Sequence, residues 1–266
     1  MILFHSVLFA LVSLIASIVG TICGIGGGII IKPMLDLFGW ESVTTISFMS
    51  GCTVLAMSTY SVLKSLSSNE KNVNLSKGTP LAIGASVGGI IGKQMFSTIK
   101  ATFENPNTIG AIQAFCLTII TIGTLIYTIR KDVIKTYDIN NKVVCFLIGC
   151  VLGIISSFLG IGGGPINLVI LFYFFSMPTK TAAANSLYII LFSQLSSFIS
   201  TLLTKSVPAF SIITLGLMVG GGVAGGMIGR KINKKINTAV VDKLFIGLMI
   251  FIILVNIYNT IKYTII

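Results

Sequence analysis

The chain has 266 residues, of which 54% are hydrophobic and only 9% are charged. An average soluble domain carries about 25% charged residues, so this composition excludes a soluble globular protein and is typical of an integral membrane protein surrounded by lipid. The net charge of +11 is then explained by basic loops that stay in the cytoplasm, and we expect no nucleic acid partner.

Long uncharged stretches predict membrane-spanning helices along the whole chain. A helix of roughly 20 apolar residues crosses a bilayer, whereas the strands of a membrane barrel have about 10 residues of alternating polarity. We therefore predict an all-α fold. The first stretch starts at the N-terminus, and it lacks the positive n-region of a signal peptide. The later stretches are 42–63, 105–129, 143–179, 181–204, 206–229 and 244–261, and 78–99 joins them if Lys93 lies near its end.

The pentapeptide GIGGG interrupts two apolar stretches, at 24–28 and again at 160–164. As an unbroken helix, 143–179 would be about 55 Å long, which exceeds the hydrocarbon thickness of about 30 Å. Glycine weakens a helix by about 1 kcal/mol, and Pro165 suits the first turn of a new helix. We therefore expect about eight long membrane helices and two short broken or re-entrant helices, one after each GIGGG.

The two halves of the chain match at a second place. VGGIIGK at 87–93 resembles AGGMIGR at 224–230, an offset of 137 residues, and the glycine clusters are 136 residues apart. The chain is thus predicted to be a tandem repeat. We assign 1–130 to the first membrane repeat, 131–142 to a cytoplasmic linker and 143–266 to the second membrane repeat.

The distribution of the 18 basic residues predicts how the repeats are oriented. If the short helices do not carry the chain across the membrane, nine basic residues fall on each side of the membrane. If the short helices take the chain across, thirteen fall on one side and four on the other, with Lys32 inside a segment. The second arrangement follows the positive-inside rule, and its odd number of crossings inverts the second repeat. The charged loops 64–77, 130–142 and 230–243 would then be cytoplasmic.

Two segments of the chain, one in each half, resemble the sequence signature of a known family. GIGGGIIIKPML and GIGGGPINLVIL, each followed by a segment of small residues and Ser, are similar to the duplicated signature of the TauE/SafE family of sulfite and organosulfonate exporters. Asn185 stands where the family usually has Thr, the second repeat lacks a counterpart of Pro33, and Lys32 is unusual in its run. The resemblance covers nearly the whole chain. It implies a bacterial inner-membrane carrier for small sulfur-containing anions.

Two opposed helix N-termini predict an anion site between the breaks. A helix N-terminus carries roughly half a positive charge and free N–H groups, and small polar residues on the following helices can add neutral hydrogen bonds. Alternatively, those polar residues only pack helices together, and Lys32 and Asp36 neutralise each other or lie at the interface beside Trp40. The candidate substrate-binding residues are Gly24, Gly26, Gly27, Gly28, Lys32, Ser47, Ser50, Gly160, Gly162, Gly163, Gly164, Pro165, Asn167, Asn185, Ser186 and Gln194.

Taken together, these patterns predict a secondary transporter of small anions, with a sulfur oxoanion or organosulfonate as substrate. The alternative is an anion channel or a non-transport membrane subunit. Seven acidic residues and one His do not form the clusters that an enzyme requires, so we expect neither catalysis nor a cofactor or metal. A coupling ion, proton or sodium, and the oligomeric state stay open.

Overall fold

The computed structural model describes residues 2–67, 73–103, 106–131, 133–161 and 163–265, and within them every regular element is a helix. This confirms the predicted all-α fold class. The first half contains α1 (Ile2–Cys23), α2 (Gly28–Phe38), α3 (Val43–Leu66), α4 (Leu75–Thr102) and α5 (Pro106–Arg130). The second half contains α6 (Lys142–Leu159), α7 (Gly164–Phe175), α8 (Thr179–Leu203), α9 (Ile212–Lys235) and α10 (Thr238–Ile265).

The lengths of these helices match the predicted pattern of eight long and two short elements. Within the described part of the chain, seven helices are long and apolar enough to cross a membrane: α1, α3, α5, α6, α8, α9 and α10. Helix α4 is as long as α10, 28 residues, but it carries Lys77, Lys93 and Lys100. The short helices α2 and α7 have 11 and 12 residues and follow the two glycine clusters.

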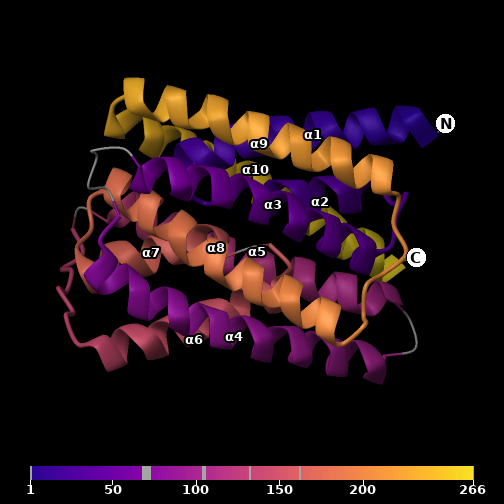
Figure 1. Cartoon of the computed structure of the whole chain (residues 1–266), viewed down its shortest axis with the longest axis horizontal. Helices are drawn as coiled ribbons and strands as arrows, with labels where there is room; N and C mark the ends of the chain where they lie inside the picture. The colour runs from indigo at the N-terminus through magenta and orange to yellow at the C-terminus, as the bar shows by residue number, and fades with distance from the viewer. Residues whose placement is uncertain (1, 68–72, 104–105, 132, 162, 266) are drawn as a thin grey trace.

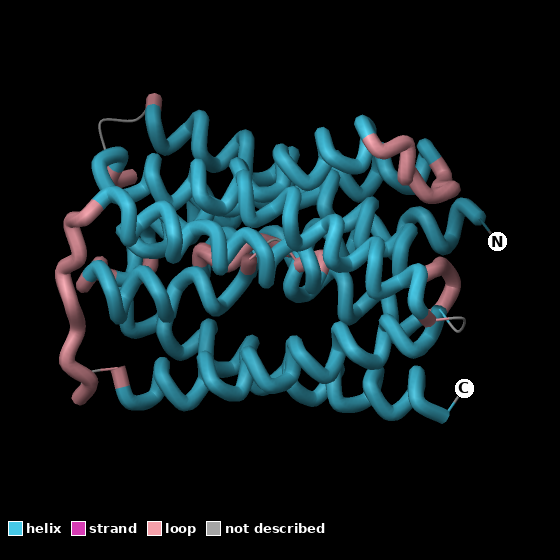
Figure 2. The backbone as a smooth tube through the Cα atoms, turned by 90° about the horizontal axis from the view of Figure 1, so that it is seen from below, coloured by secondary structure: helices cyan, strands magenta, loops and turns pink. Residues whose placement is uncertain are grey.

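The helices run side by side between two ends of the molecule. Figures 1 and 2 show both termini at one end, here called the terminal end. Figure 1 shows residues 133–141, which lead from α5 to α6, at the other end, here called the linker end. Helix α1 starts at the terminal end and α6 starts at the linker end. The two halves therefore enter the bundle from opposite ends, as inverted repeats do.

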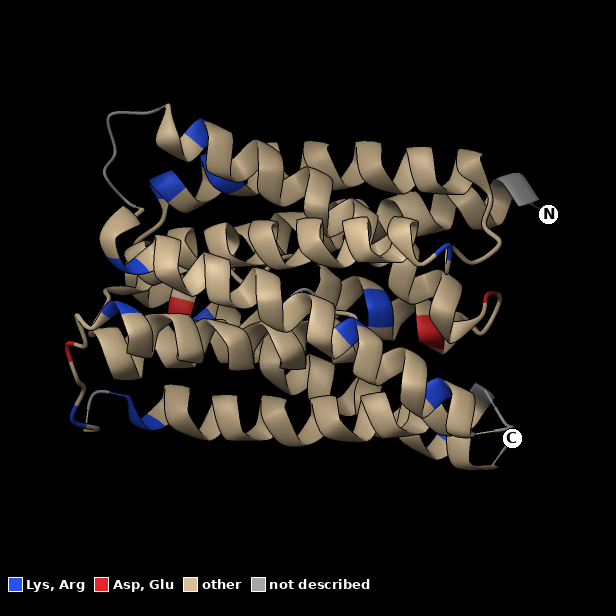
Figure 3. Ribbon diagram, turned by 60° about the horizontal axis from the view of Figure 1, so that its bottom comes forward, with Lys and Arg blue, Asp and Glu red and all other residues tan. Residues whose placement is uncertain are grey.

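The short helix of each half returns toward the end at which that half began. A Cβ atom at Gly27 would lie 2.9 Å from Oγ of Ser17, so α2 starts partway along α1. Trp40, just after α2, stacks on His5 at a ring-centroid distance of 3.9 Å, which places the end of α2 at the terminal end. With this return, each half leaves the bundle at the end opposite its start. Figure 3 shows Lys and Arg concentrated at the linker end.

The closest helix pairs join the two halves rather than lying within one half. In Figure 1, indigo α1 lies beside orange α9, and α4 lies beside α6. Gly84, Gly88 and Gly92 of α4 are so close to the backbone of α6 that a Cβ atom on any of them would collide with it. Small residues at a spacing of four let membrane helices approach closely. The halves are therefore not separately packed bodies, and the boundaries of the two repeats stay a prediction.

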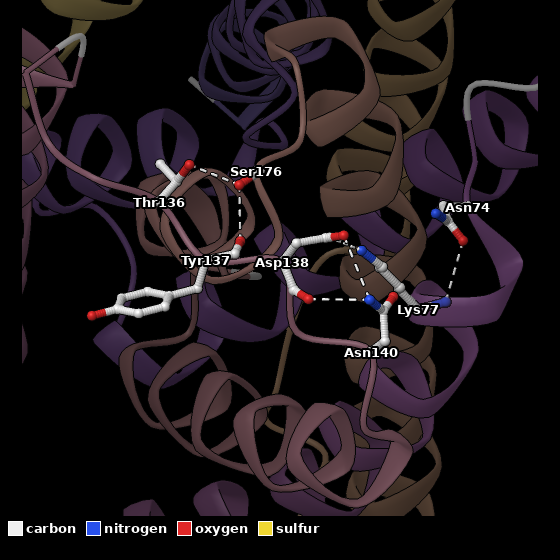
Figure 4. Close-up of polar contacts among 7 residues, drawn as sticks. All are labelled: Asn74, Lys77, Thr136, Tyr137, Asp138, Asn140 and Ser176. Carbon is white, nitrogen blue, oxygen red and sulfur yellow. Dashed lines mark hydrogen bonds and ion pairs between the residues drawn. The ribbon is translucent and has the colours of Figure 1, made fainter.

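The connection between the halves is fastened to helix ends at the linker end (Figure 4). The Ser176 hydroxyl donates a hydrogen bond to the carbonyl of Tyr137 at 2.9 Å, and its oxygen lies 2.7 Å from Oγ1 of Thr136, within hydrogen-bond distance. Lys77 at the start of α4 forms an ion pair with Asp138, and this bond and its charge hold the pKa of Asp138 below its ordinary value. The connection is thus tied to both α4 and the end of α7.

Two predicted boundaries are wrong. Helix α9 starts at Ile212 and not at 206, because Pro208 interrupts the run and Oγ of Ser211 caps the helix by accepting a hydrogen bond from the amide of Thr214 at 3.3 Å. The charged segment 230–243 is not a loop, because α9 continues to Lys235 and α10 begins at Thr238. Residues 68–72 of the charged segment 64–77 lie outside the described residues.

Candidate functional site

Both glycine breaks adopt backbone conformations that favour glycine. The φ angle is +76° at Gly24 and +72° at Gly26 in the first break, and +68° at Gly160 and +100° at Gly163 in the second. A residue with a side chain is strained at such angles, so these positions require glycine for their backbone alone. Because the first N–H groups of a helix have no intrahelical partners, each break also places backbone donors inside the bundle.

The two breaks contact each other. A Cβ atom at Gly28 would collide with the carbonyl oxygen of Ile161 and would lie 3.0 Å from a methyl group of Val54. A Cβ atom at Gly164 would lie 3.1 Å from Cδ1 of Ile29. Backbone and apolar side chains therefore close the space between the breaks in this conformation. The anion site predicted between the two helix N-termini stays a prediction.

A small polar cavity, here called the terminal-end cavity, lies beside the second break. Its volume is about 30 Å³, and it contains one cation, Lys93. The Lys93 ammonium lies 5.6 Å from the centroid of the Phe96 ring and forms no ion pair with any described residue. The cavity is lined by Ser47, Phe48, Gly51, Cys52, Lys93, Phe96, Gln113, Ser157, Gly160, Gln194, Ser197, Phe198 and Thr201.

Several polar groups of this cavity are buried without a partner. Ser157 is 6% exposed, and its hydroxyl forms no hydrogen bond with a described residue. The hydroxyl of Ser47 and the Oε1 atom of Gln113 also lack partners among the described residues, while Nε2 of Gln113 donates to the carbonyl of Phe158 at 2.6 Å. Unsatisfied buried polar groups cost about 1–3 kcal/mol each, so a polar ligand or water at this place is favoured.

A wider cavity of about 310 Å³ continues from the terminal-end cavity toward the terminal end. The two share Lys93 and Phe96, and the wider one adds Lys100 from the last turn of α4. Its other lining residues are Thr44, Ser97, Ala101 and Ser206. Lys93 therefore stands where the wide outer space narrows toward the second break.

A third cavity, here called the linker-end cavity, lies on the opposite side of the closed centre. Its volume is about 170 Å³. Arg230 donates hydrogen bonds to the carbonyls of Ser61 and Lys64, both at 3.2 Å, and the Ser61 hydroxyl is without a partner among the described residues. The cavity is lined by Thr21, Ser61, Ser65, Lys180, Ala183, Ala184, Leu187, Arg230, Asn233 and Lys234.

The three cavities share one electrostatic property. Each contains at least one Lys or Arg, and no Asp or Glu is among their described lining residues. The wider cavity continues the terminal-end cavity, so one positive region lies on each side of the closed centre. Such regions attract anions and repel cations. Among the described residues, no group of three or more His, Cys, Asp or Glu is arranged to hold a metal ion.

The structure separates the sequence-predicted site residues into those that line a cavity and those that do not. Ser47, Gly160 and Gln194 line the terminal-end cavity. Ser50 and Ser186 are fully buried, and their hydroxyls have no hydrogen-bond partner in the described part of the chain. Gly162 lies outside the described residues. The residues that build the two breaks and their contact are Gly24, Gly26, Gly27, Gly28, Gly163, Gly164, Pro165 and Asn167, all of them buried.

Two predicted site residues have protein partners instead. Nδ2 of Asn185 donates to the carbonyl of Thr181 at 2.8 Å, and its Oδ1 accepts from the amide of Asn74 at 3.1 Å, just before α4. Lys32 pairs with Asp36 at 2.8 Å, and both are 3% exposed. The first contact is the one expected if Lys32 and Asp36 neutralise each other. The contacts of Asn185 give it a role in holding α4 against α8.

Lys93 and Arg230 were absent from the sequence-predicted site, although both end the heptapeptides that reveal the repeat. The signal was present in the sequence, because a cation at the end of the same motif in both halves is unusual for a membrane helix. A sequence pattern does not show which cavity a helix face lines. From the sequence, both residues therefore count only toward the distribution of basic charge between the two sides.

Comparison with known proteins agrees with this architecture. The sulfite exporter TauE/SafE family profile matches residues 9–256. The chain is 26% identical over 225 residues to "Probable membrane transporter protein YunE" of Bacillus subtilis (strain 168), which covers 76% of this chain and 80% of that protein. No solved structure matches the chain with statistical significance. The chain therefore belongs to the sulfite exporter TauE/SafE family of membrane transporters.

Proposed function

We propose that this protein is a secondary carrier of a small anion, and that the anion is a sulfur oxoanion or a short organosulfonate. The observation that carries the proposal is the pair of cationic, carboxylate-free cavities on opposite sides of the closed centre. A cation or a neutral sugar would gain nothing from Lys93 and Arg230, whereas a compact anion gains charge-assisted hydrogen bonds. The family name adds the sulfur chemistry.

The closed centre favours a carrier over the alternative of an anion channel. A channel needs a continuous polar path, whereas here Gly28 meets Ile161 between the two cavities. A carrier exposes its site to one side at a time, and two inverted halves that meet at the middle of the membrane are suited to this exchange. We place the linker end in the cytoplasm of a bacterial inner membrane, because it holds most of the basic residues.

The direct test is uptake into proteoliposomes of radiolabelled sulfite, thiosulfate, sulfate and a short sulfonate. We expect at least one to accumulate above protein-free liposomes. With the membrane potential clamped, unlabelled anion inside the vesicles should accelerate its entry, which a channel does not show. Transport of an organic cation or a neutral amino acid in place of all four anions would overturn the assignment. Entry of an anion without acceleration by the internal anion would replace the carrier with a channel.

A further inference from the structure

The residues of the linker-end cavity correspond, one by one, to residues around the terminal-end cavity. All ten have a counterpart 136 or 137 positions away in the other half, and every counterpart lines the terminal-end cavity or its outer continuation. Thr21 corresponds to Ser157, Ser61 to Ser197 and Arg230 to Lys93. The two cavities are therefore formed by equivalent positions of the two repeats, one cavity at each end of the molecule.

Only one of these ten pairs is positively charged in both halves. Lys180 corresponds to Thr44, and Lys234 corresponds to Ser97, so their charges exist in one cavity alone. Lys93 and Arg230 keep the positive charge in both. Because the other charges of the two cavities differ between the halves, a charge present at both equivalent places calls for a reason common to both.

The two cations have different partners in this conformation. Lys93 forms no ion pair with a described residue, and buried hydroxyls of its cavity are unpartnered, among them that of Ser157. Arg230 instead donates to backbone carbonyls at the end of α3. An anion entering the terminal-end cavity thus finds a cation that gives up no ion pair to bind it. An anion in the linker-end cavity competes with two carbonyl oxygens for the guanidinium.

Building on the proposed function, we propose that Lys93 and Arg230 are the two anion contacts of the transport path, one for each face. Lys93 binds the anion in the terminal-end cavity together with Ser157 and Gln194, and Arg230 binds it in the linker-end cavity together with Ser61. Transport passes the anion from one cation to the other while the glycine breaks separate. The ligand is an anion with oxygen acceptors, because the groups beside Lys93 are hydroxyls and amides that donate hydrogen bonds.

Thiol protection at one reporter in each cavity tests this assignment. Cys52 lines the terminal-end cavity, and Ala184→Cys places a thiol in the linker-end cavity. Each is the only cysteine of a purified full-length chain whose other cysteines are replaced by Ala and whose thermal unfolding temperature matches that of the unsubstituted protein. Sulfate and methanesulfonate are the probe ligands, because neither reacts with thiols. A neutral maleimide is the reagent, so that its own approach does not depend on cavity charge.

We expect the probe anion to slow modification of both reporters. Lys93→Gln should raise the anion concentration needed for protection of Cys52 at least about tenfold, because a hydrogen bond to a charged group is lost, and leave protection at the Ala184→Cys reporter unchanged. Arg230→Gln should do the reverse. Lys93→Arg should keep protection, since it keeps the charge. Lys205→Gln and Lys231→Gln remove a neighbouring charge at the same two ends without touching a cavity, and should change neither reporter.

The outcomes separate this inference from the proposed function. If an anion is transported but Lys93→Gln leaves protection of Cys52 intact, or weakens both reporters equally, the assignment of one cation to each face is wrong and the carrier proposal stands. If neither probe anion protects a reporter although one of them is transported, the assignment is also wrong. If no tested anion is transported or protects either thiol, the proposed function itself fails.

Discussion

At the scale of single residues, the glycines of the breaks serve two different physical requirements. Gly24 and Gly160 need a positive φ, which a side chain disfavours. Gly28 needs empty space, because the carbonyl of Ile161 occupies the place that its Cβ would take. The repeated pentapeptide predicted where the helices break. It did not predict that the breaks close on each other, because glycine spacing holds no information on what lies opposite.

We predict that Gly28→Ala impairs transport much more than it impairs insertion. The added methyl group forces the two breaks apart, and overpacking of this kind costs about 1–3 kcal/mol. Uptake into proteoliposomes should fall about tenfold, with a lower thermal unfolding temperature in detergent. Gly247→Ala is the matched control, since nothing lies within 4 Å of a Cβ at Gly247. Equal uptake by both variants would show that transport does not require the close contact between the two breaks.

The buried Lys32 and Asp36 pair gives a second prediction at this scale. Removing one partner of a buried ion pair leaves an uncompensated charge and destabilises a protein by about 3–5 kcal/mol, whereas replacing both with apolar residues is often neutral. Lys32→Met should therefore lower the unfolding temperature, and Lys32→Met with Asp36→Leu should restore it, with transport retained. Thermal unfolding and uptake of both variants check this. A stable double variant that does not transport would place Lys32 in the substrate path.

At the scale of elements, the heptapeptides that reveal the repeat have a packing role. On α9, Gly221, Gly225 and Gly229 face backbone atoms of α1, as the glycines of α4 face α6. The sequence predicted the helices well because apolar length and glycine breaks are local properties. It did not predict which helices pair, since a face of small residues fits any close neighbour.

We predict that Gly225→Leu prevents assembly of α1 with α9. A Cβ atom there would collide with the carbonyl oxygen of Leu14, so the helices cannot keep their approach. The variant should aggregate or unfold at a much lower temperature when extracted in detergent. Gly220→Leu changes the same helix to the same residue where no atom lies within 4 Å, and it should extract as a single species. If both extract equally well, the close approach of α1 and α9 is not needed for stability.

At the scale of the whole molecule, the ends of the bundle carry unequal charge. The odd number of crossings was predictable from the basic residues alone, because the positive-inside rule acts on total charge near each end. The cavities were not predictable, because each is built from helices of both halves and depends on their pairing. The same pairing makes the two cavities counterparts of each other.

We predict that the linker end faces the cytoplasm. Val133→Cys, 85% exposed in the connection 131–141, should resist an impermeant thiol reagent added to intact cells when it is the only cysteine, and so should Asn237→Cys. Glu41→Cys, exposed at the terminal end, should be labelled from outside. The reverse labelling pattern would show that the molecule has the opposite orientation in the membrane. Lys93 would then lie toward the cytoplasm and Arg230 toward the outside.

The pairing of α1 with α9 has a consequence for how the chain is made. Helix α1 ends at Cys23 and its partner starts at Ile212, so the ribosome adds nearly the whole remaining chain before they can meet. At a synthesis rate of about 5–20 residues per second, this interval is roughly 10–40 s. During that time α1 faces lipid or an insertion chaperone with the surface later covered by α9. A nascent chain arrested before α9 therefore exposes the face of α1 that α9 covers in the complete fold.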